Sequence, residues 1–99
     1  MAVIPKIKHY SLPKDQGSGI VEKQIHEGSV FVGAAWADAR PHLLTAEDES
    51  KPLVTRSVRI VKVGDEVVGN PGTLIGHVVN DNGPDDQAYA LIFLDLGES

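Results

Sequence analysis

The sequence predicts a single, mostly β domain over residues 1–99, and three observations support this fold class. Ninety-nine residues are enough for one hydrophobic core but not for two. Ten glycines and six prolines interrupt the chain at short intervals. The runs between them are rich in valine and isoleucine, as is typical of strands. We therefore expect five to seven short strands in a small antiparallel sheet, a sandwich or a partly open barrel, with at most one short helical turn.

The last two candidate strands form the clearest pair. Tyr89–Leu96 is apolar on both faces, which predicts a strand that is covered on both sides. The turn formers of residues 80–87 come directly before it, so Thr73–Val79 should return antiparallel against it. The other candidate strands are Lys6–Leu12, Ile20–Ile25, Val30–Ala37 and Val54–Val63, with Val67-Val68 as a candidate for a very short one.

Two segments carry helical signals. Thr45-Ala46-Glu47-Asp48 has the form of a capping box, and Pro52 would end the turn. Because this segment lacks an apolar stripe, we expect one or two helical turns or an acidic loop. Ile20–Ile25 fits helical spacing about as well as strand spacing, but its flanking glycines limit a helix to about two turns and favour a strand.

Composition and charge exclude several classes of protein. Acidic residues outnumber basic ones by 14 to 9, so the net charge of −5 argues against binding to nucleic acid or anionic lipid. The absence of cysteine excludes disulfides and thiolate metal sites. Apolar runs are too short to cross a bilayer, and the first four residues, cut off by Pro5 and Lys6, do not resemble a signal peptide. We expect a soluble protein of the cytoplasm.

No catalytic constellation is apparent. The four histidines are scattered over different predicted elements, and no G-x-S-x-G nucleophile elbow is present. His77 with the aspartates that follow it is a weak set of metal ligands, and a solvated turn explains it more simply. We therefore expect no enzyme activity, no catalytic residue, no cofactor and no metal site.

Clustered carboxylates are the first candidate binding residues. They could contact a basic protein surface by competing with phosphate, but they also fit ordinary solvated loops. The acidic candidates are Glu47, Asp48, Glu49, Asp81, Asp85 and Asp86.

The second candidate set combines a tryptophan with two arginines. Trp36 follows small residues, which allow a ring to lie flat or another backbone to approach, so it fits core packing as well as partner binding. Arg56 and Arg59 could line an anion or nucleotide pocket, although protection of an edge strand by charge is the simpler explanation for them. In the same strand the apolar side changes after Ile60, which predicts a β-bulge or a passage from an exposed to a covered stretch.

Five features follow one another along the chain. They are the aromatic strand Ile7–Leu12, the segment from Gly28 to Trp36-Ala37, the strand and glycine turn Arg56–Gly64, the run Ile75-Gly76-His77-Val78, and a closing strand that contains Phe93. Their order resembles a family of short proteins of tailed bacteriophages, catalogued as a domain of unknown function. The resemblance implies a phage origin and a β fold, and it supplies no catalytic residues. Residues 41–52 and 80–87 depart from the family's compact pattern.

These observations lead us to expect a phage accessory protein that binds and inhibits a host or defence machine stoichiometrically. Its partner would be a host protein with a basic surface. The alternatives are a protein that sequesters a nucleotide-like small molecule at Trp36, Arg56 and Arg59, and a minor structural protein of the virion. Because Tyr89–Leu96 needs cover on both faces, a second copy of the chain is a further expected partner.

Overall fold

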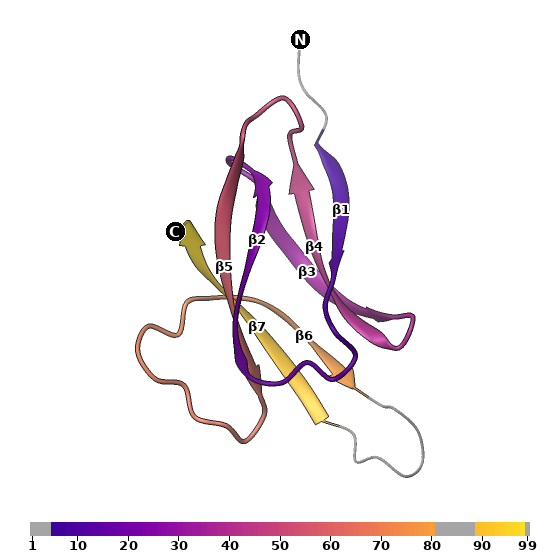
Figure 1. The fold of residues 1–99 in the computed structure, drawn as a ribbon, viewed down its shortest axis with the longest axis vertical. Coiled ribbons are helices and arrows are strands. Elements are labelled where there is room, and N and C mark those ends of the chain that lie inside the picture. Colours follow the sequence, from indigo (N-terminus) through magenta and orange to yellow (C-terminus); the bar gives the residue numbers. More distant parts are fainter. Residues whose placement is uncertain (1–4, 81–88, 99) are drawn as a thin grey trace.

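The computed structural model describes residues 5–80 and 89–98, and within these ranges the chain forms two antiparallel sheets and no helix (Figure 1). The predicted fold class, a small β-sandwich, is confirmed, and the two sheets do not close into a barrel. The strands are β1 (Lys6–Ser11), β2 (Gly19–His26), β3 (Val30–Ala37), β4 (Arg40–Glu47), β5 (Leu53–Lys62), β6 (Thr73–Asn80) and β7 (Tyr89–Glu98).

The strands divide between the sheets in a mixed order along the chain. One sheet has three strands in the order β1-β4-β3, and the other has four in the order β2-β5-β7-β6. The strands β5 and β7 are therefore central in the four-stranded sheet, and β4 is central in the three-stranded one. The edge strands are β2 and β6 in the first sheet and β1 and β3 in the second. The predicted antiparallel pairing of the last two strands is confirmed, with Val78 opposite Leu91 and Asn80 opposite Tyr89.

The core lies between the facing sides of the two sheets. Alternate residues of each strand point inward, so every strand contributes at least one apolar side chain to the core or to its margin. The buried members of this core are Leu12, Leu43, Val58, Ile60, Val78, Leu91 and Phe93, and the half-buried Tyr10, Phe31, Trp36 and Tyr89 pack against them.

Small residues bring the two sheets close together on one side. A Cβ atom on Gly76 of β6 would lie 3.4 Å from the backbone nitrogen of Ala34 in β3. The sequence analysis expected the small residues before Trp36 to allow such an approach of another backbone, and this expectation is confirmed. Trp36 itself is half-buried against the core.

The segment Thr45-Ala46-Glu47-Asp48 corrects one prediction. It was expected to form one or two helical turns or an acidic loop, but its first three residues end β4, the central strand of the three-stranded sheet. Every residue of β4 is buried or half-buried, because neighbouring strands cover it on both edges. A capping box is a local signal, and the ladders with β1 and β3 outweigh it. The Val67-Val68 segment, in contrast, belongs to no strand and is exposed.

Two expectations about the fifth strand also need correction. β5 lies between β2 and β7, so its charged residues do not protect a sheet edge. A bulge is present, but it lies in the partner strand: Ser57 faces Gly97 and Val58 faces Asp95, which leaves Leu96 of β7 as the extra residue. The residues Ile60 and Val61 are both buried, so this part of the strand is covered on both sides.

Candidate functional site

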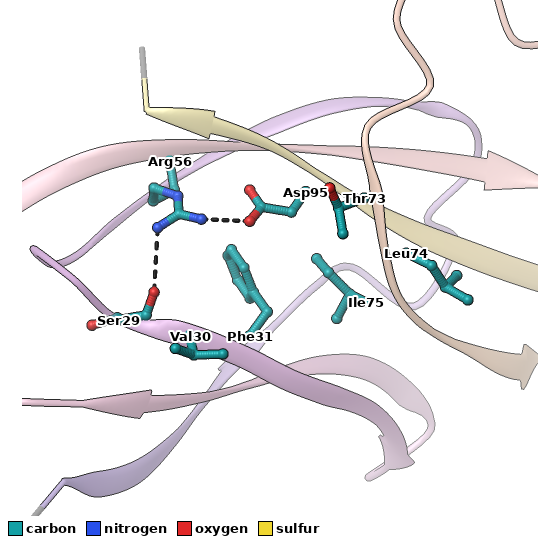
Figure 2. Close-up of a pocket in the computed structure, with 8 residues that line it drawn as sticks. All are labelled: Ser29, Val30, Phe31, Arg56, Thr73, Leu74, Ile75 and Asp95. Atoms are coloured by element: carbon teal, nitrogen blue, oxygen red, sulfur yellow. Dashed lines mark hydrogen bonds and ion pairs between the residues drawn. The ribbon is translucent and has the colours of Figure 1, made fainter.

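The predicted site residue Arg56 lies at a hollow of about 290 Å³ between the edge strands of the two sheets. Figure 2 shows that the start of β3 and the start of β6 form its two sides, while Arg56 of β5 and Asp95 of β7 come from the strands between them. The residues that line it are Ser29, Val30, Phe31, Arg56, Thr73, Leu74, Ile75 and Asp95.

The charge of Arg56 is already matched within the protein. Its Nη2 atom donates to the carboxylate of Asp95, and its Nη1 atom donates to the backbone oxygen of Ser29 at 3.3 Å (Figure 2). The guanidinium also lies over the ring of Phe31, 5.4 Å from its centroid. Both members of the ion pair are largely buried, with side chains 14% and 21% exposed. This hollow is therefore close to electrically neutral and gives an anion little reason to bind.

The three residues proposed for a nucleotide pocket do not come together. Side chains of a strand alternate between its two faces. Arg59 lies between the inward-facing Val58 and Ile60, so its side chain points outward, to the opposite face of the sheet from Arg56. Trp36 lies opposite Pro41 at the far end of β3 and does not line the Arg56 hollow.

Glu47, one of the acidic candidates, is completely buried. Its Oε2 atom accepts hydrogen bonds from the hydroxyls of Tyr10 and Thr45, the latter at 2.6 Å. Its Oε1 atom accepts one from the backbone N–H of His26 at 3.0 Å and lies 2.8 Å from Nδ1 of the same residue. Glu47 was expected in an exposed acidic segment, and this expectation is wrong.

These contacts explain the ionisation of Glu47 and Tyr10. Burial alone would raise the pKa of Glu47, but the hydrogen bonds from Thr45, Tyr10 and His26 outweigh it and lower the pKa from 4.5 to about 2. The pKa of Tyr10 is raised well above 10, first by burial and then by its hydrogen bond to the Glu47 carboxylate. Glu47 is thus a charged structural group that ties the end of β2 to β1 and β4.

The other acidic candidates have mixed surroundings. Asp48 accepts hydrogen bonds from the backbone N–H and hydroxyl of Ser50, which lower its pKa. Glu49 is exposed and pairs with the ammonium groups of Lys8 and Lys6, each at 3.1 Å. Their roles in partner binding stay predictions. The remaining acidic candidates, Asp81, Asp85 and Asp86, lie outside the described residues.

One surface feature was not predicted as a site: an apolar outer face on the four-stranded sheet. Its first row crosses all four strands, because Ile20 faces Arg59, Arg59 faces Leu94, and Leu94 faces Leu74. Side chains opposite one another in paired strands share a face. The next rows complete this apolar outer face with Val61, Ile92 and His77, and then Val63, Ala90 and Val79.

The outer strands of this surface are open to solvent, whereas Val61 near its middle is buried and Arg59, Ile92 and Leu94 are half-buried. Ile20 is 56% exposed, Leu74 67% and Val79 51%. Soluble monomers seldom leave a continuous apolar patch uncovered. The sequence signal for it was the two-faced apolar pattern of Tyr89–Leu96, which predicted a covering element for the face opposite the core.

Arg59 is the charged residue in the first row of this face. It is half-buried between Ile20 and Leu94, and its Nε atom is buried without a hydrogen-bond partner among the described residues. The other guanidinium nitrogens also have no hydrogen-bond partner within residues 5–80 and 89–98. The side chain therefore offers several hydrogen-bond donors to a bound molecule.

Within residues 5–80 and 89–98, no three side chains of histidine, aspartate or glutamate gather as a metal centre. In the same residues no helix is long and apolar enough to cross a membrane. We find no match to this chain among protein-family models, curated proteins or solved structures. The resemblance to short phage proteins therefore stays a prediction.

Proposed function

We propose that the chain is a non-catalytic protein-binding protein, and that it docks through the apolar outer face of its four-stranded sheet. The observation that carries this proposal is the continuous row of Ile20, Arg59, Leu94 and Leu74 across all four strands. Burying exposed aliphatic side chains gives about 25 cal/mol per Å². A partner that covers this face therefore gains binding energy without any rearrangement of the core.

Arg59 defines the chemistry of the partner. Arginine is enriched at the energetic centres of interfaces, where neighbouring apolar contacts exclude water from its hydrogen bonds. A guanidinium without internal partners is best matched by a carboxylate. We infer a protein partner that presents aliphatic side chains around an aspartate, a glutamate or a chain-terminal carboxylate.

This partner differs from the one that the acidic residues suggested. A basic partner surface would need the carboxylates of residues 47–49, but Glu47 is buried and Glu49 is shared by two lysines. The resemblance to phage proteins supports a host protein as the target, held in a stoichiometric complex that blocks its activity. We retain that role, with Arg59 in place of the acidic residues as the centre of recognition.

The alternative of nucleotide sequestration finds less support. Its candidate residues Arg56, Arg59 and Trp36 lie in three separate places of one chain, so a pocket that holds all three would have to form between protomers. Arg56, the one that lines a hollow, is neutralised by Asp95.

The test compares capture of partners by the wild-type chain and by variants of exposed residues. Leu74→Lys and Ile20→Lys place charge on the docking face, and Arg59→Glu reverses the central charge. Val68→Lys is the matched control, because Val68 is 77% exposed and lies outside the sheets. We expect one protein to bind wild type and Val68→Lys, to be lost with Leu74→Lys and Ile20→Lys, and to bind Arg59→Glu at least about tenfold more weakly.

Equal capture by all five chains would contradict the proposal. Light scattering on the same proteins distinguishes a second copy from a separate partner. If the wild-type chain is a dimer that Leu74→Lys separates, the occupant is a second copy, and a separate partner on this face is excluded.

A further inference from the structure

The hollow at Arg56 lies where the free edges of the two sheets face each other, and the proposed function does not use it. β3 is an edge strand of the three-stranded sheet, and β6 is an edge strand of the four-stranded one. Three consecutive residues from each side line the hollow, residues 29–31 and residues 73–75 (Figure 2). In an edge strand, the backbone N–H and C=O groups of alternate residues point away from the paired neighbour. The hollow is therefore bordered on two sides by backbone groups that take no part in either sheet's ladder.

Bulges in the strands surround this hollow. Among the described strand pairings, the three with a register shift are β3–β4 between Phe31 and Gly33, β6–β7 between Leu74 and Gly76, and β5–β7 in the strands between them. A bulge bends its strand, and bulges are common at sheet edges and next to functional sites. Past the first two bulges β3 and β6 come into contact, since a Cβ atom on Gly76 would lie 3.4 Å from the backbone nitrogen of Ala34. At the start of both strands the sheets stay apart and leave about 290 Å³.

Neither side of the hollow carries the usual protection against strand addition. Natural edge strands are often blunted by charged side chains or by proline. Residues 30–32 are Val-Phe-Val and residues 73–75 are Thr-Leu-Ile, without a charge or a proline among them. Val30 is 60% exposed and Leu74 is 67% exposed, so the mouth of the hollow is apolar and open to solvent.

Ser29 adds a buried hydrogen-bonding group to the lining. The residue is only 6% exposed, and its Oγ atom has no hydrogen-bond partner in the part of the chain that the structure describes. Buried polar atoms normally have a partner, and a hydroxyl can either donate or accept. The charges beside it, in contrast, are already matched, because Arg56 donates to Asp95 and to the backbone oxygen of Ser29. The hollow therefore favours a ligand that has hydrogen-bonding groups but no charge.

We propose that this hollow binds a short, uncharged segment of a partner protein, in extended conformation, between the edges of β3 and β6. Successive residues of an extended chain direct their backbone groups to opposite sides, so one segment can bond to both edges at once. Three such residues are about 10 Å long, which matches the three residues that line each side. The segment also supplies a backbone partner for the hydroxyl of Ser29, and its side chains contact Val30 and Leu74.

This site is separate from the docking face, although Leu74 borders both. Binding of a segment in the hollow does not need the docking face, so the two proposals can fail separately. Ile20→Lys changes the docking face alone, and Ser29→Ala changes the hollow alone.

The experiment titrates the isotope-labelled full chain with the capped peptide acetyl-Thr-Val-Thr-Val-Thr-amide and follows the backbone amide signals by NMR. We expect saturable binding of one equivalent, with the largest shifts in residues 29–32 and 73–76. The same peptide with N-methyl groups on its three central residues cannot donate to a strand edge. It should therefore bind at least about tenfold more weakly.

Two variants test the lining. Ser29→Ala removes a buried hydroxyl without a partner, so it should keep or raise the melting temperature while it weakens peptide binding about three- to tenfold. Val30→Lys places a charge on the edge of β3 and should weaken peptide binding at least about tenfold. Ile7→Lys is the matched control, because Ile7 is 63% exposed and faces Ala46 from β1 as Val30 does from β3. It should bind the peptide as the wild type does.

Several outcomes would overturn the proposal. They are no saturable binding by the wild type, unchanged affinity of Ser29→Ala, and equal affinity of Val30→Lys and Ile7→Lys. Equal affinity for the methylated peptide would overturn it as well, because backbone pairing would then contribute nothing. Light scattering detects a second copy in the hollow: a wild-type dimer that Val30→Lys separates and Ile20→Lys leaves intact would exclude a separate partner from this site.

Discussion

Glu47 and His26 join the two sheets through a double contact. The carboxylate at the end of β4 accepts a hydrogen bond from the backbone N–H of His26 at the end of β2, and it also lies 2.8 Å from the imidazole Nδ1. Tyr10 and Thr45 occupy the other carboxylate oxygen. A buried carboxylate is costly unless it is fully hydrogen-bonded, and here both oxygens have two partners.

Glu47→Gln should therefore destabilise the protein by about 3 kcal/mol, since the amide turns one acceptor into a donor among groups that already donate. Urea denaturation followed by circular dichroism measures this change. Glu49→Gln is the control, because its ion pairs with two lysines are exposed and solvent screens them, so a much smaller loss is expected. Similar losses for both variants would contradict the role of Glu47.

The same carboxylate predicts a dependence of stability on acid. Its pKa falls from 4.5 to about 2 on folding, so its contribution is fully present above the unfolded-state value. That contribution is lost as the pH falls from about 4.5 through about 2, because the unfolded chain then binds the proton first. Unfolding free energies measured between pH 2 and 6 should fall more steeply for the wild type than for Glu47→Gln. Parallel curves for the two proteins would argue against this prediction.

The strand pattern was predictable because it depends on local alternation and on turn residues. Six strands were recognised in this way, among them the two-faced run Tyr89–Leu96, which forms β7 between β5 and β6. β4 was missed because two of its last residues, Thr45 and Glu47, are polar. Their burial depends on donors from Tyr10 and His26, which lie 37 and 21 residues away from Glu47.

The candidate sites were less predictable than the strands, because each depends on the register between distant strands. Arg59 joins an apolar row only when β2, β7 and β6 are aligned beside β5. Arg56 looked like a free cation, because only the β5–β7 register, with Asp95 opposite Val58, places a carboxylate within its reach. No local pattern encodes these pairings.

Arg56 and Asp95 should show energetic coupling. A double-mutant cycle with Arg56→Met and Asp95→Asn isolates their interaction, and we expect about 1–2 kcal/mol in urea denaturation because both side chains are largely buried. Lys6 and Glu49 provide an exposed ion pair for comparison, for which we expect a weaker coupling because solvent screens it. Equal coupling in the two cycles would show that burial of the Arg56 pair adds nothing.

A glycine in the tight turn between β3 and β4 should make the protein more stable. Ala37 pairs with Arg40, and the two residues between them, Asp38 and Ala39, have φ angles of +53° and +58°. A two-residue hairpin loop of this kind favours glycine at its second position. Ala39→Gly should therefore raise the unfolding free energy by about 0.5–1 kcal/mol, as measured in urea. Ala37→Gly, within the strand, should lower it by a similar amount, and a loss in both variants would refute the strained-turn account.

Gly72 should tolerate a side chain less well than Gly64, although both have positive φ angles of +88° and +105°. A Cβ atom at Gly72 would lie 2.6 Å from the backbone oxygen of Asp95, whereas one at Gly64 would meet nothing within 4 Å. Gly64→Ala should lower the unfolding free energy only by the strain of a left-handed alanine, about 1–2 kcal/mol. Gly72→Ala must also push β7 away at Asp95, the ion-pair partner of Arg56. We therefore expect it to lower the unfolding free energy by at least about 1 kcal/mol more than Gly64→Ala does. Thermal or urea unfolding compares the two variants directly, and equal destabilisation would mean that β6 and β7 do not approach as closely at this point as the structure has them.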